Sequence, residues 1–265
     1  MARTREAESG IETDRVSVAY VGLKALSEAS LVAPLASITG LIGPNGAGKT
    51  TSFNALTGLV APSDGTVRLF GEDVTKRSPA HRARMGLGRT FQRMELVNAM
   101  SVRTNVLLGA ECRRVGSNPW RHLVRSKGER TQIEGATDEA LELCGIADLR
   151  DLTVGNLSTG QRRLVELARV FAGDFKMLLL DEPSSGLDEE ETGRFGAILT
   201  RVVRERGIGI LLVEHDMPLV MSICDYIYVL DFGQMIFEGT VPETQASPLV
   251  RAAYLGSEEV EERSA

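Results

Sequence analysis

Residues 41–53, LIGPNGAGKTTSF, constrain the fold of this 265-residue chain more than any other segment. They fit the pattern G-x-x-x-x-G-K-[ST] and stand between an apolar run, LASITGLIG, and a segment of helical character that extends to about Gly58. A strand, a glycine loop and a helix in that order form the context that a phosphate-binding loop requires. The alternative is a glycine-rich turn with a surface lysine, and the agreement of all three parts disfavours it.

The loop has a specific chemistry. Its glycines let backbone N–H groups surround phosphate oxygens, and the N-terminus of the following helix adds a partial positive charge. We expect Lys49 to reach the β- and γ-phosphates of a nucleoside triphosphate, the Thr50 hydroxyl to bind Mg²⁺ and the Thr51 hydroxyl to contact the phosphates. The residues predicted to bind ATP here are Gly43, Pro44, Asn45, Gly46, Ala47, Gly48, Lys49, Thr50 and Thr51.

Two acidic residues follow a second apolar run, residues 177–180. A carboxylate at the tip of a central strand can hold Mg²⁺ through its water shell, which predicts that role for Asp181. The next carboxylate, Glu182, can polarise the attacking water as a general base. Two solvated loop acids are the alternative, and the phosphate-binding loop elsewhere in the chain favours the catalytic interpretation.

The remaining pattern predicts an α/β fold. RVSVAY, from Arg15, alternates like a strand, Ser78 and Pro79 begin a short helix, and a longer helix covers residues 189–206. Helical periodicity dominates residues 91–173, with Leu164, Leu167, Ala168 and Phe171 on one face. The other strands are continuously apolar, which is typical of a parallel sheet covered on both faces.

The composition argues against nucleic-acid-binding, disulfide-rich, zinc-binding and membrane-spanning proteins. The net charge of −6 and the pI of about 5.3 argue against a nucleic-acid partner, whose binding surface would be basic. Three widely spaced cysteines are neither a disulfide framework nor a zinc pattern, so we expect small apolar residues. Since no window approaches the ~20 apolar residues that span a bilayer, any work on a membrane is expected from outside it.

LSTGQRR, residues 157–163, resembles the signature motif of the ATP-binding cassette (ABC) ATPases. It precedes the LLLDEP strand, as in that family, and the resemblance covers roughly residues 16–255. The other motifs that carry the resemblance are Tyr20 before the glycine loop (A-loop), Gln92 in RTFQ (Q-loop), SSGLD from Ser184 to Asp188 (D-loop) and His215 in VEHD (switch histidine).

The resemblance implies a P-loop NTPase with a RecA-like core, a mostly parallel sheet, an antiparallel β edge and a helical subdomain. It implies one ABC ATPase domain, residues 14–256, between flexible tails 1–13 and 257–265. The core would comprise residues 14–90 and 174–256, and the helical subdomain residues 91–173.

In this family two cassettes pair head to tail, and the signature of one covers the γ-phosphate held by the other. The resemblance therefore implies that Ser158, Gly160 and Gln161 contact the partner's ATP. Thr159 departs from the usual glycine, and its side chain must point away from phosphate. Asp188 would contact the nucleotide site across the dimer; its alternative role is a plain helix cap.

The other motif residues also have implied roles. Gln92 would touch Mg²⁺ and the attacking water, with a solvated loop amide as the alternative. His215 would contact the γ-phosphate, or is an ordinary loop histidine. Tyr20 would stack on adenine, or simply packs in its strand.

Finer stretches, such as RMGLGRTFQ and LLVEHDMPLVMSICDYIYVLDFG, are similar to the LivG-type subunits of branched-chain amino acid importers. That similarity implies a peripheral protein on the cytoplasmic face of the cell membrane. It implies as partners a LivF-type cassette or a second copy, two transmembrane permease subunits and, indirectly, an extracytoplasmic substrate-binding protein. The alternatives are a urea or amide importer, a lipopolysaccharide-type exporter and a soluble ABC ATPase.

Overall fold

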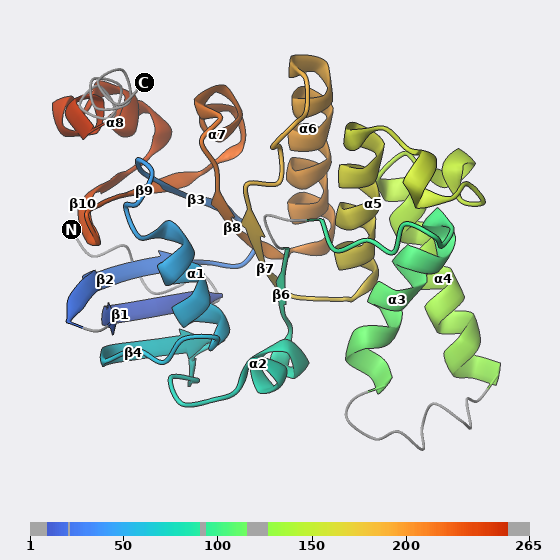
Figure 1. Cartoon of the computed structure of the whole chain (residues 1–265), viewed down its shortest axis with the longest axis horizontal. Helices are drawn as coiled ribbons and strands as arrows, with labels where there is room; N and C mark the ends of the chain where they lie inside the picture. The colour runs from blue at the N-terminus through green and yellow to red at the C-terminus, as the bar shows by residue number, and fades with distance from the viewer. Residues whose placement is uncertain (1–9, 21, 91–93, 116–126, 254–265) are drawn as a thin grey trace.

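The computed structural model describes residues 10–20, 22–90, 94–115 and 127–253 (Figure 1). The strands are β1 (Ile11–Tyr20), β2 (Leu23–Ala33), β3 (Ile38–Ile42), β4 (Asp64–Leu69), β5 (Glu72–Asp73), β6 (Leu87–Arg89), β7 (Met177–Asp181), β8 (Gly209–Val213), β9 (Tyr226–Asp231) and β10 (Gln234–Gly239). The helices are α1 (Lys49–Thr57), α2 (Pro79–Met85), α3 (Val102–Val115), α4 (Lys127–Leu143), α5 (Thr159–Ala172), α6 (Glu189–Arg206), α7 (Met217–Ile223) and α8 (Val241–Ala246), with short 3₁₀ turns at Ala147–Leu149 and Val154–Asn156.

A six-stranded sheet in the order β10-β9-β3-β8-β7-β6 forms the centre of the molecule. Strands β9, β3, β8, β7 and β6 are parallel, and β10 is antiparallel to β9. The central position of β7 in this sheet explains why its sequence is continuously apolar. Leu178 and Leu180 belong to one core cluster, whereas Met177 and Leu179 belong to the other, so both faces are buried. The predicted α/β class with a mostly parallel sheet is confirmed.

A separate antiparallel sheet, β2-β1-β4-β5, packs with α1 over one face of the central sheet. Two sequence expectations need correction here. Strand β1 begins at Ile11, so residues 11–13 lie in the sheet and not in a flexible tail. Strand β2 was missing from the sequence prediction, although it has 11 residues and pairs with most of β1.

Helices α3, α4 and α5 pack together at the side of the molecule opposite the antiparallel sheet (Figure 1). The predicted apolar face of α5 is found: Leu167, Ala168 and Phe171 are buried, and Leu164 packs against them. These helices fall within the predicted helical range 91–173, whose division from the core stays a prediction.

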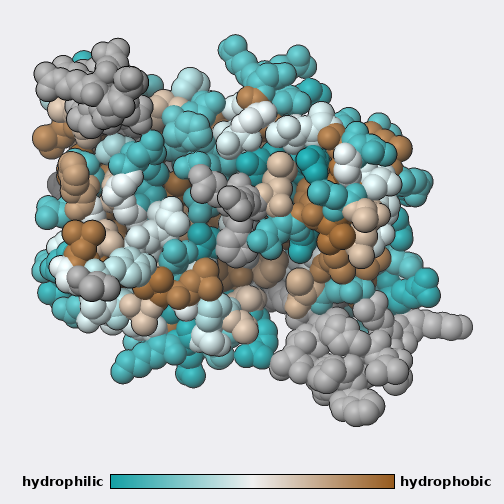
Figure 2. All heavy atoms as spheres, viewed as in Figure 1, coloured by the Kyte–Doolittle hydropathy of each residue, from teal (hydrophilic) through white to brown (hydrophobic). Residues whose placement is uncertain are grey.

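Polar side chains cover much of the face in Figure 2, and apolar ones gather over α3 and α5. In the part of the chain that the structure describes, no helix combines the length and hydrophobicity needed to span a bilayer.

Candidate nucleotide-binding site

The glycine loop joins the end of β3 to the start of α1, as its sequence predicts. Gly43 has φ 154°, and a Cβ there would collide with the carbonyl oxygen of Leu230. Gly48 has φ 105° and caps α1 without a side chain, and its Cβ would lie 2.8 Å from Ala25 O. Only glycine meets both demands, and the first N–H groups of α1 are left for an anion.

The Lys49 side chain folds back over this loop. Its ammonium donates hydrogen bonds to Gly43 O at 2.7 Å and to Pro44 O at 2.9 Å. Burial lowers the pKa of Lys49, and the nearby charges of Glu182 and Asp181 oppose that shift. The predicted lysine and the two predicted acids are therefore near enough to interact electrostatically.

The other loop residues lie as a phosphate cradle would need. Asn45 and Gly46 are exposed at the tip of the loop, and Ala47 is buried beneath it. Thr50 and Thr51 occupy the first turn of α1, with Thr50 exposed and Thr51 half-buried. Both hydroxyls are thus at the helix end where the loop would hold the triphosphate.

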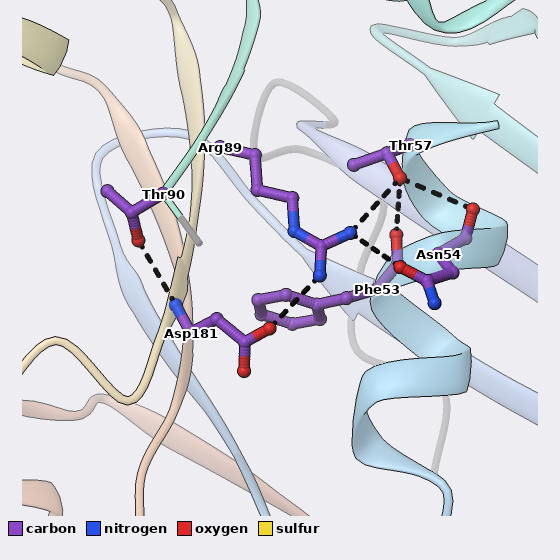
Figure 3. A network of polar contacts seen from close by, with 6 residues as sticks. All are labelled: Phe53, Asn54, Thr57, Arg89, Thr90 and Asp181. Atoms are coloured by element: carbon purple, nitrogen blue, oxygen red, sulfur yellow. Dashed lines mark hydrogen bonds and ion pairs between the residues drawn. The ribbon is translucent and has the colours of Figure 1, made fainter. Parts of the chain in front are cut away.

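Asp181 ends β7 as a buried residue held by two consecutive residues at the end of β6, Arg89 and Thr90 (Figure 3). Its Oδ2 accepts a hydrogen bond of 3.0 Å from Nη2 of Arg89, and its backbone N–H donates to Thr90 Oγ1 at 3.3 Å. Burial raises the pKa of Asp181, while the hydrogen bond and the charge of Arg89 oppose the rise. Arg89 was absent from the sequence prediction, because nothing in the pattern RMGLGRTFQ indicates that its side chain reaches β7.

Glu182 follows in a left-handed backbone conformation with φ 47°, which is uncommon for a residue other than glycine. Its N–H donates to Val213 O at 2.9 Å, the end of the neighbouring strand β8. The chain therefore leaves the extended conformation of β7 directly after Asp181, and Glu182 is half-buried where Asp181 is buried.

The donor set fits Mg²⁺ bound together with a nucleotide. Among the described residues, no cluster of three or more His, Cys, Asp or Glu could hold a metal by itself. Mg²⁺ commonly takes one or two carboxylates and substrate phosphates instead of an all-protein cage. Thr50 and Asp181 are the side chains of the right chemistry, and Oδ2 of Asp181 is the oxygen bonded to Arg89.

The signature segment begins α5 with a capping box. Ser158 Oγ accepts a hydrogen bond from Gln161 N at 3.2 Å, and Gln161 Oε1 accepts from Ser158 N at 3.0 Å. The Ser158 hydroxyl, used there as an acceptor, keeps its proton for another acceptor. The Thr159 methyl carbon lies 3.2 Å from the position that a Cβ on Gly186 would occupy, so this side chain faces the D-loop.

The D-loop is fastened to the signature helix. A Cβ on Gly160 would collide with the Glu191 carboxylate, so α6 and α5 approach closely at this glycine. Arg163 Nε donates to Ser185 O at 3.3 Å. Asp188 caps α6 in a capping box with Glu191, which is the helix-cap role that the sequence left open.

His215 follows β8, and 65% of its side chain is exposed, so the imidazole is accessible. Its neighbour Glu214 is fully buried and accepts hydrogen bonds from Ser184 N at 2.8 Å and Ser184 Oγ at 2.7 Å. Glu214 thereby links the switch histidine to the D-loop. Sequence reasoning missed this carboxylate because an acid after an apolar strand usually signals a solvated loop.

Two further residues were predicted to act at this site, Tyr20 and Gln92. Tyr20 ends β1 and is 44% exposed, which leaves the residue accessible for stacking. Gln92 lies outside the described residues.

The start of α5 and the start of α1 belong to helices on opposite sides of β6 and β7 (Figure 1).

A cavity of about 560 Å³ lies beside this site, and we call it the α2–α5 cavity. Its wall comes from α1, α2, β6, α3, α5 and the segments next to them. It is lined by Thr57, Leu59, Pro79, Ala80, Ala83, Arg84, Leu87, Gly88, Arg89, Thr90, Glu95, Gly109, Cys112, Glu166, Arg169, Val170 and Phe175. The cavity excludes the glycine loop but shares Arg89 with the contacts of Asp181.

The curated relatives found by comparison are transport ATP-binding proteins. BraF of Pseudomonas aeruginosa, a high-affinity branched-chain amino acid transport ATP-binding protein, is 36% identical over 250 residues, 93% of this chain and 97% of the relative. LivG of Salmonella typhimurium, with the same description, is 37% identical over 240 residues, 89% and 94% of the two chains. LptB of Haemophilus influenzae, a lipopolysaccharide export system ATP-binding protein, is 32% identical over 248 residues, 94% and 98%.

Solved structures of ATP-binding cassettes share the fold. The ADP conformation of MJ1267, an ATP-binding cassette of an ABC transporter, matches with a TM-score of 0.82 and 29% identity over 94% of this chain and 99% of that one. The structure of cbiO1 from Clostridium perfringens matches with a TM-score of 0.79 and 27% identity over 97% and 99%. The family model for the ABC transporter covers residues 26–185, more than half of the chain. The chain therefore belongs to the ABC transporter family, as one of its nucleotide-binding ATPase cassettes.

Proposed function

We propose that this protein is the ATPase subunit of an importer of branched-chain amino acids, bound to the cytoplasmic face of the membrane. The alignment with BraF and LivG carries the proposal, since it runs through about nine-tenths of both chains. The grouping of Lys49, Asp181 and Glu182 supports the hydrolytic part.

Binding of the phosphates would change the hydrogen-bond acceptors of the Lys49 ammonium. On binding, the Lys49 ammonium moves from the carbonyls of Gly43 and Pro44 to the β- and γ-phosphate oxygens, and the N-terminal amides of α1 supply further donors. Thr51 adds a hydroxyl, and Tyr20 stacks on the adenine. Thr50 and Asp181 would hold Mg²⁺, which neutralises charge on the triphosphate.

Hydrolysis would need a base and groups that sense the γ-phosphate. Glu182 orients the attacking water and polarises it, and the accessible imidazole of His215 contacts the γ-phosphate. Gln92 is assigned to the same water by its motif alone. The buried Glu214 holds the backbone beside His215 and Ser184, so the histidine and the D-loop move together.

Two chains would complete each site. The start of α5, with Ser158, Gly160 and Gln161, covers the triphosphate held by the partner, and Asp188 lies at the same interface. The partner is a LivF-type cassette or a second copy of this chain. The two transmembrane permease subunits would insert cytoplasmic segments into the α2–α5 cavity, whose volume of about 560 Å³ suits a few side chains. The substrate-binding protein would act outside the membrane.

Purification from the native membrane tests the proposal. We expect the tagged chain to bring with it two membrane-spanning proteins and a second cassette. Vesicles that contain the complex should accumulate labelled leucine, isoleucine or valine with ATP inside, and the Lys49→Ala variant should not. A complex that takes up none of the three amino acids would contradict the assigned substrate.

An export cassette is the second candidate, because LptB is 32% identical over 94% of the chain. The two candidates require opposite directions of transport. An exporter would associate with membrane proteins but show no uptake that depends on a substrate-binding protein. Extraction of lipopolysaccharide from the same vesicles would favour that candidate.

A further inference from the structure

Arg89 is the residue that the cavity and the candidate magnesium site share. It ends β6 and lines the α2–α5 cavity. Its guanidinium lies among side chains from α1 and β7, as the labelled residues in Figure 3 show. A residue that contacts both regions can transmit a change in one of them to the other.

The two ends of the guanidinium make different contacts. Nη2 donates to Asp181 Oδ2 at 3.0 Å. Nη1 donates to Asn54 Oδ1 at 2.8 Å and to Thr57 Oγ1 at 3.4 Å, and the Phe53 ring centroid lies 5.5 Å from the Arg89 Cζ atom. Asn54, Thr57 and Phe53 all belong to α1, so Arg89 bridges the phosphate-loop helix and the end of β7.

The ion pair is well shielded from water. The Arg89 and Asp181 side chains are 9% and 6% exposed. Removing one partner of such a pair leaves an uncompensated buried charge, which costs far more than the loss of a surface pair. The fork of Arg89 can also hold two acceptors at a fixed angle, which the single ammonium of a lysine cannot do.

We propose that Arg89 is a positioning residue that fixes the Asp181 carboxylate for Mg²⁺ and couples it to the α2–α5 cavity. An occupant of the cavity that displaces Arg89 would loosen Asp181, and by thermodynamic reciprocity Mg²⁺ with nucleotide would alter the cavity wall. The inference rests on the proposed function only for the identity of the occupant, the permease segment. The coupling itself lies within this chain.

Cys112 gives a probe for the cavity wall. It is exposed and lines the cavity, whereas Cys144 and Cys224 are buried. The exposure of Cys112 departs from the expectation of three small apolar residues. A polarity-sensitive fluorophore attached to its thiol would report on the cavity, while a fluorescent, non-hydrolysable ATP analogue reports the apparent Kd for Mg²⁺.

The experiment compares Arg89→Met, Arg89→Lys and a matched control, Arg103→Met. Arg103 lies on α3, the helix of Cys112, and forms an ion pair of 3.5 Å with Asp138; neither residue lines the cavity. In the unchanged protein we expect the emission of the label to shift when Mg²⁺ joins the bound analogue. Arg89→Met should raise the apparent Kd for Mg²⁺ about 10- to 100-fold, as loss of an outer-sphere partner does, and should abolish the emission shift.

The variants separate charge from geometry. Arg89→Lys keeps the charge but not both contacts, so it should resemble Arg89→Met more than the unchanged protein. Arg103→Met should leave the Kd and the emission shift unchanged. Asn54→Ala, which removes one anchor of Arg89 and leaves Asp181 intact, should raise the Kd by a smaller factor, and it serves as the test if Arg89→Met does not fold.

An unchanged Kd for Mg²⁺ in Arg89→Met would overturn the inference, as would an unchanged Kd in Asn54→Ala if Arg89→Met does not fold. An emission shift that persists in Arg89→Met would also overturn it. Neither result involves the permease. A failure to find membrane partners would contradict the proposed function and leave this measurement standing.

Discussion

Glu182 is one of seven non-glycine residues with positive φ among the described residues, and it is the one that follows the candidate magnesium ligand Asp181. Its left-handed conformation, φ 47°, follows directly after a buried parallel strand. A non-glycine residue in that region costs of order 1–3 kcal/mol and persists only when the surroundings impose it. The hydrogen bond from its N–H to Val213 O provides one such constraint. The turn gives Asp181 and Glu182 different environments, as two different roles require.

The Glu182→Gln variant tests the role of this carboxylate. The amide has the same shape but cannot act as a base, so we expect ATP binding to persist and turnover to fall about 100- to 10,000-fold. Steady-state ATPase rates and nucleotide Kd would be measured together. Glu189→Gln, an exposed acid in the first turn of α6, is the control and should keep its rate. Full activity in Glu182→Gln would remove the general-base assignment.

At the scale of elements, bulges explain which strands the sequence revealed. Arg15 and Glu28 both have positive φ, 48° and 49°, where the register of β1 and β2 shifts. Buried positions are therefore three residues apart across each bulge, from Thr13 to Val16 in β1. Each bulge inserts one extra residue, which interrupts the alternation of apolar and polar residues along the strand. Strict alternation therefore predicts only the part of β1 after the bulge and does not predict β2.

Helices with explicit boundary signals were predicted well. Ser78 caps α2 with Pro79 at its first position, and α6 spans Glu189–Arg206 as expected. The glycine loop was also predictable, because its spacing encodes local geometry. The contacts of Arg89 and Glu214 were not, since they depend on strands that are far apart in sequence and meet only in the folded sheet.

Helix α1 depends on Arg82, which is almost fully buried. Its guanidinium donates to the carbonyl oxygens of Ala55, Leu56, Thr75 and Arg77. Arg82→Met would remove all four of these hydrogen bonds from a buried site, and we expect a loss of about 2–4 kcal/mol in the free energy of unfolding. Urea titration measures it. Arg84→Met, an exposed position in the same helix, should change stability by less than about 0.5 kcal/mol; equal losses would show that Arg82 has no special role.

The start of α5 allows stability and function to be separated at Ser158. Ser158→Ala removes the cap and should cost about 1 kcal/mol of stability. If the hydroxyl also contacts the partner's phosphate, the ATPase rate should fall at least tenfold, more than this loss of stability explains. Ser158→Thr keeps the hydroxyl and the cap, so it should keep most of the rate. A rate in Ser158→Ala that matches the unchanged protein would argue against any contact with nucleotide.

At the scale of the whole molecule, the two predicted phosphate-binding helix starts belong to helices on opposite sides of the central strands (Figure 1). Each is built for an anion, α1 through its glycine loop and α5 through a serine cap whose proton is available. Two copies related by a two-fold axis would bring each start of α1 opposite a start of α5. Such an interface is isologous and contains two equivalent sites.

Mixing two inactive variants tests whether the sites are shared. Lys49→Ala removes the phosphate lysine and keeps Ser158, whereas Ser158→Ala does the reverse. In a head-to-tail pair of the two variants, one site combines the intact Lys49 of one chain with the intact Ser158 of the other. We therefore expect the mixture to recover part of the ATPase rate, up to about half per pair, because one of two equivalent sites is complete.

The rate per chain of the unchanged protein should also rise with protein concentration, because association completes the site. The Glu182→Gln and Lys49→Ala pair is the control for the mixing experiment. In that pair each site contains one damaged residue from the chain that supplies its loop, so no complete site forms and no rate should return. A rate per chain that stays constant on dilution, together with no recovery in the Lys49→Ala and Ser158→Ala mixture, would contradict a homodimer with shared sites. The same mixing experiment with the co-purified second cassette would then identify which chain completes the site.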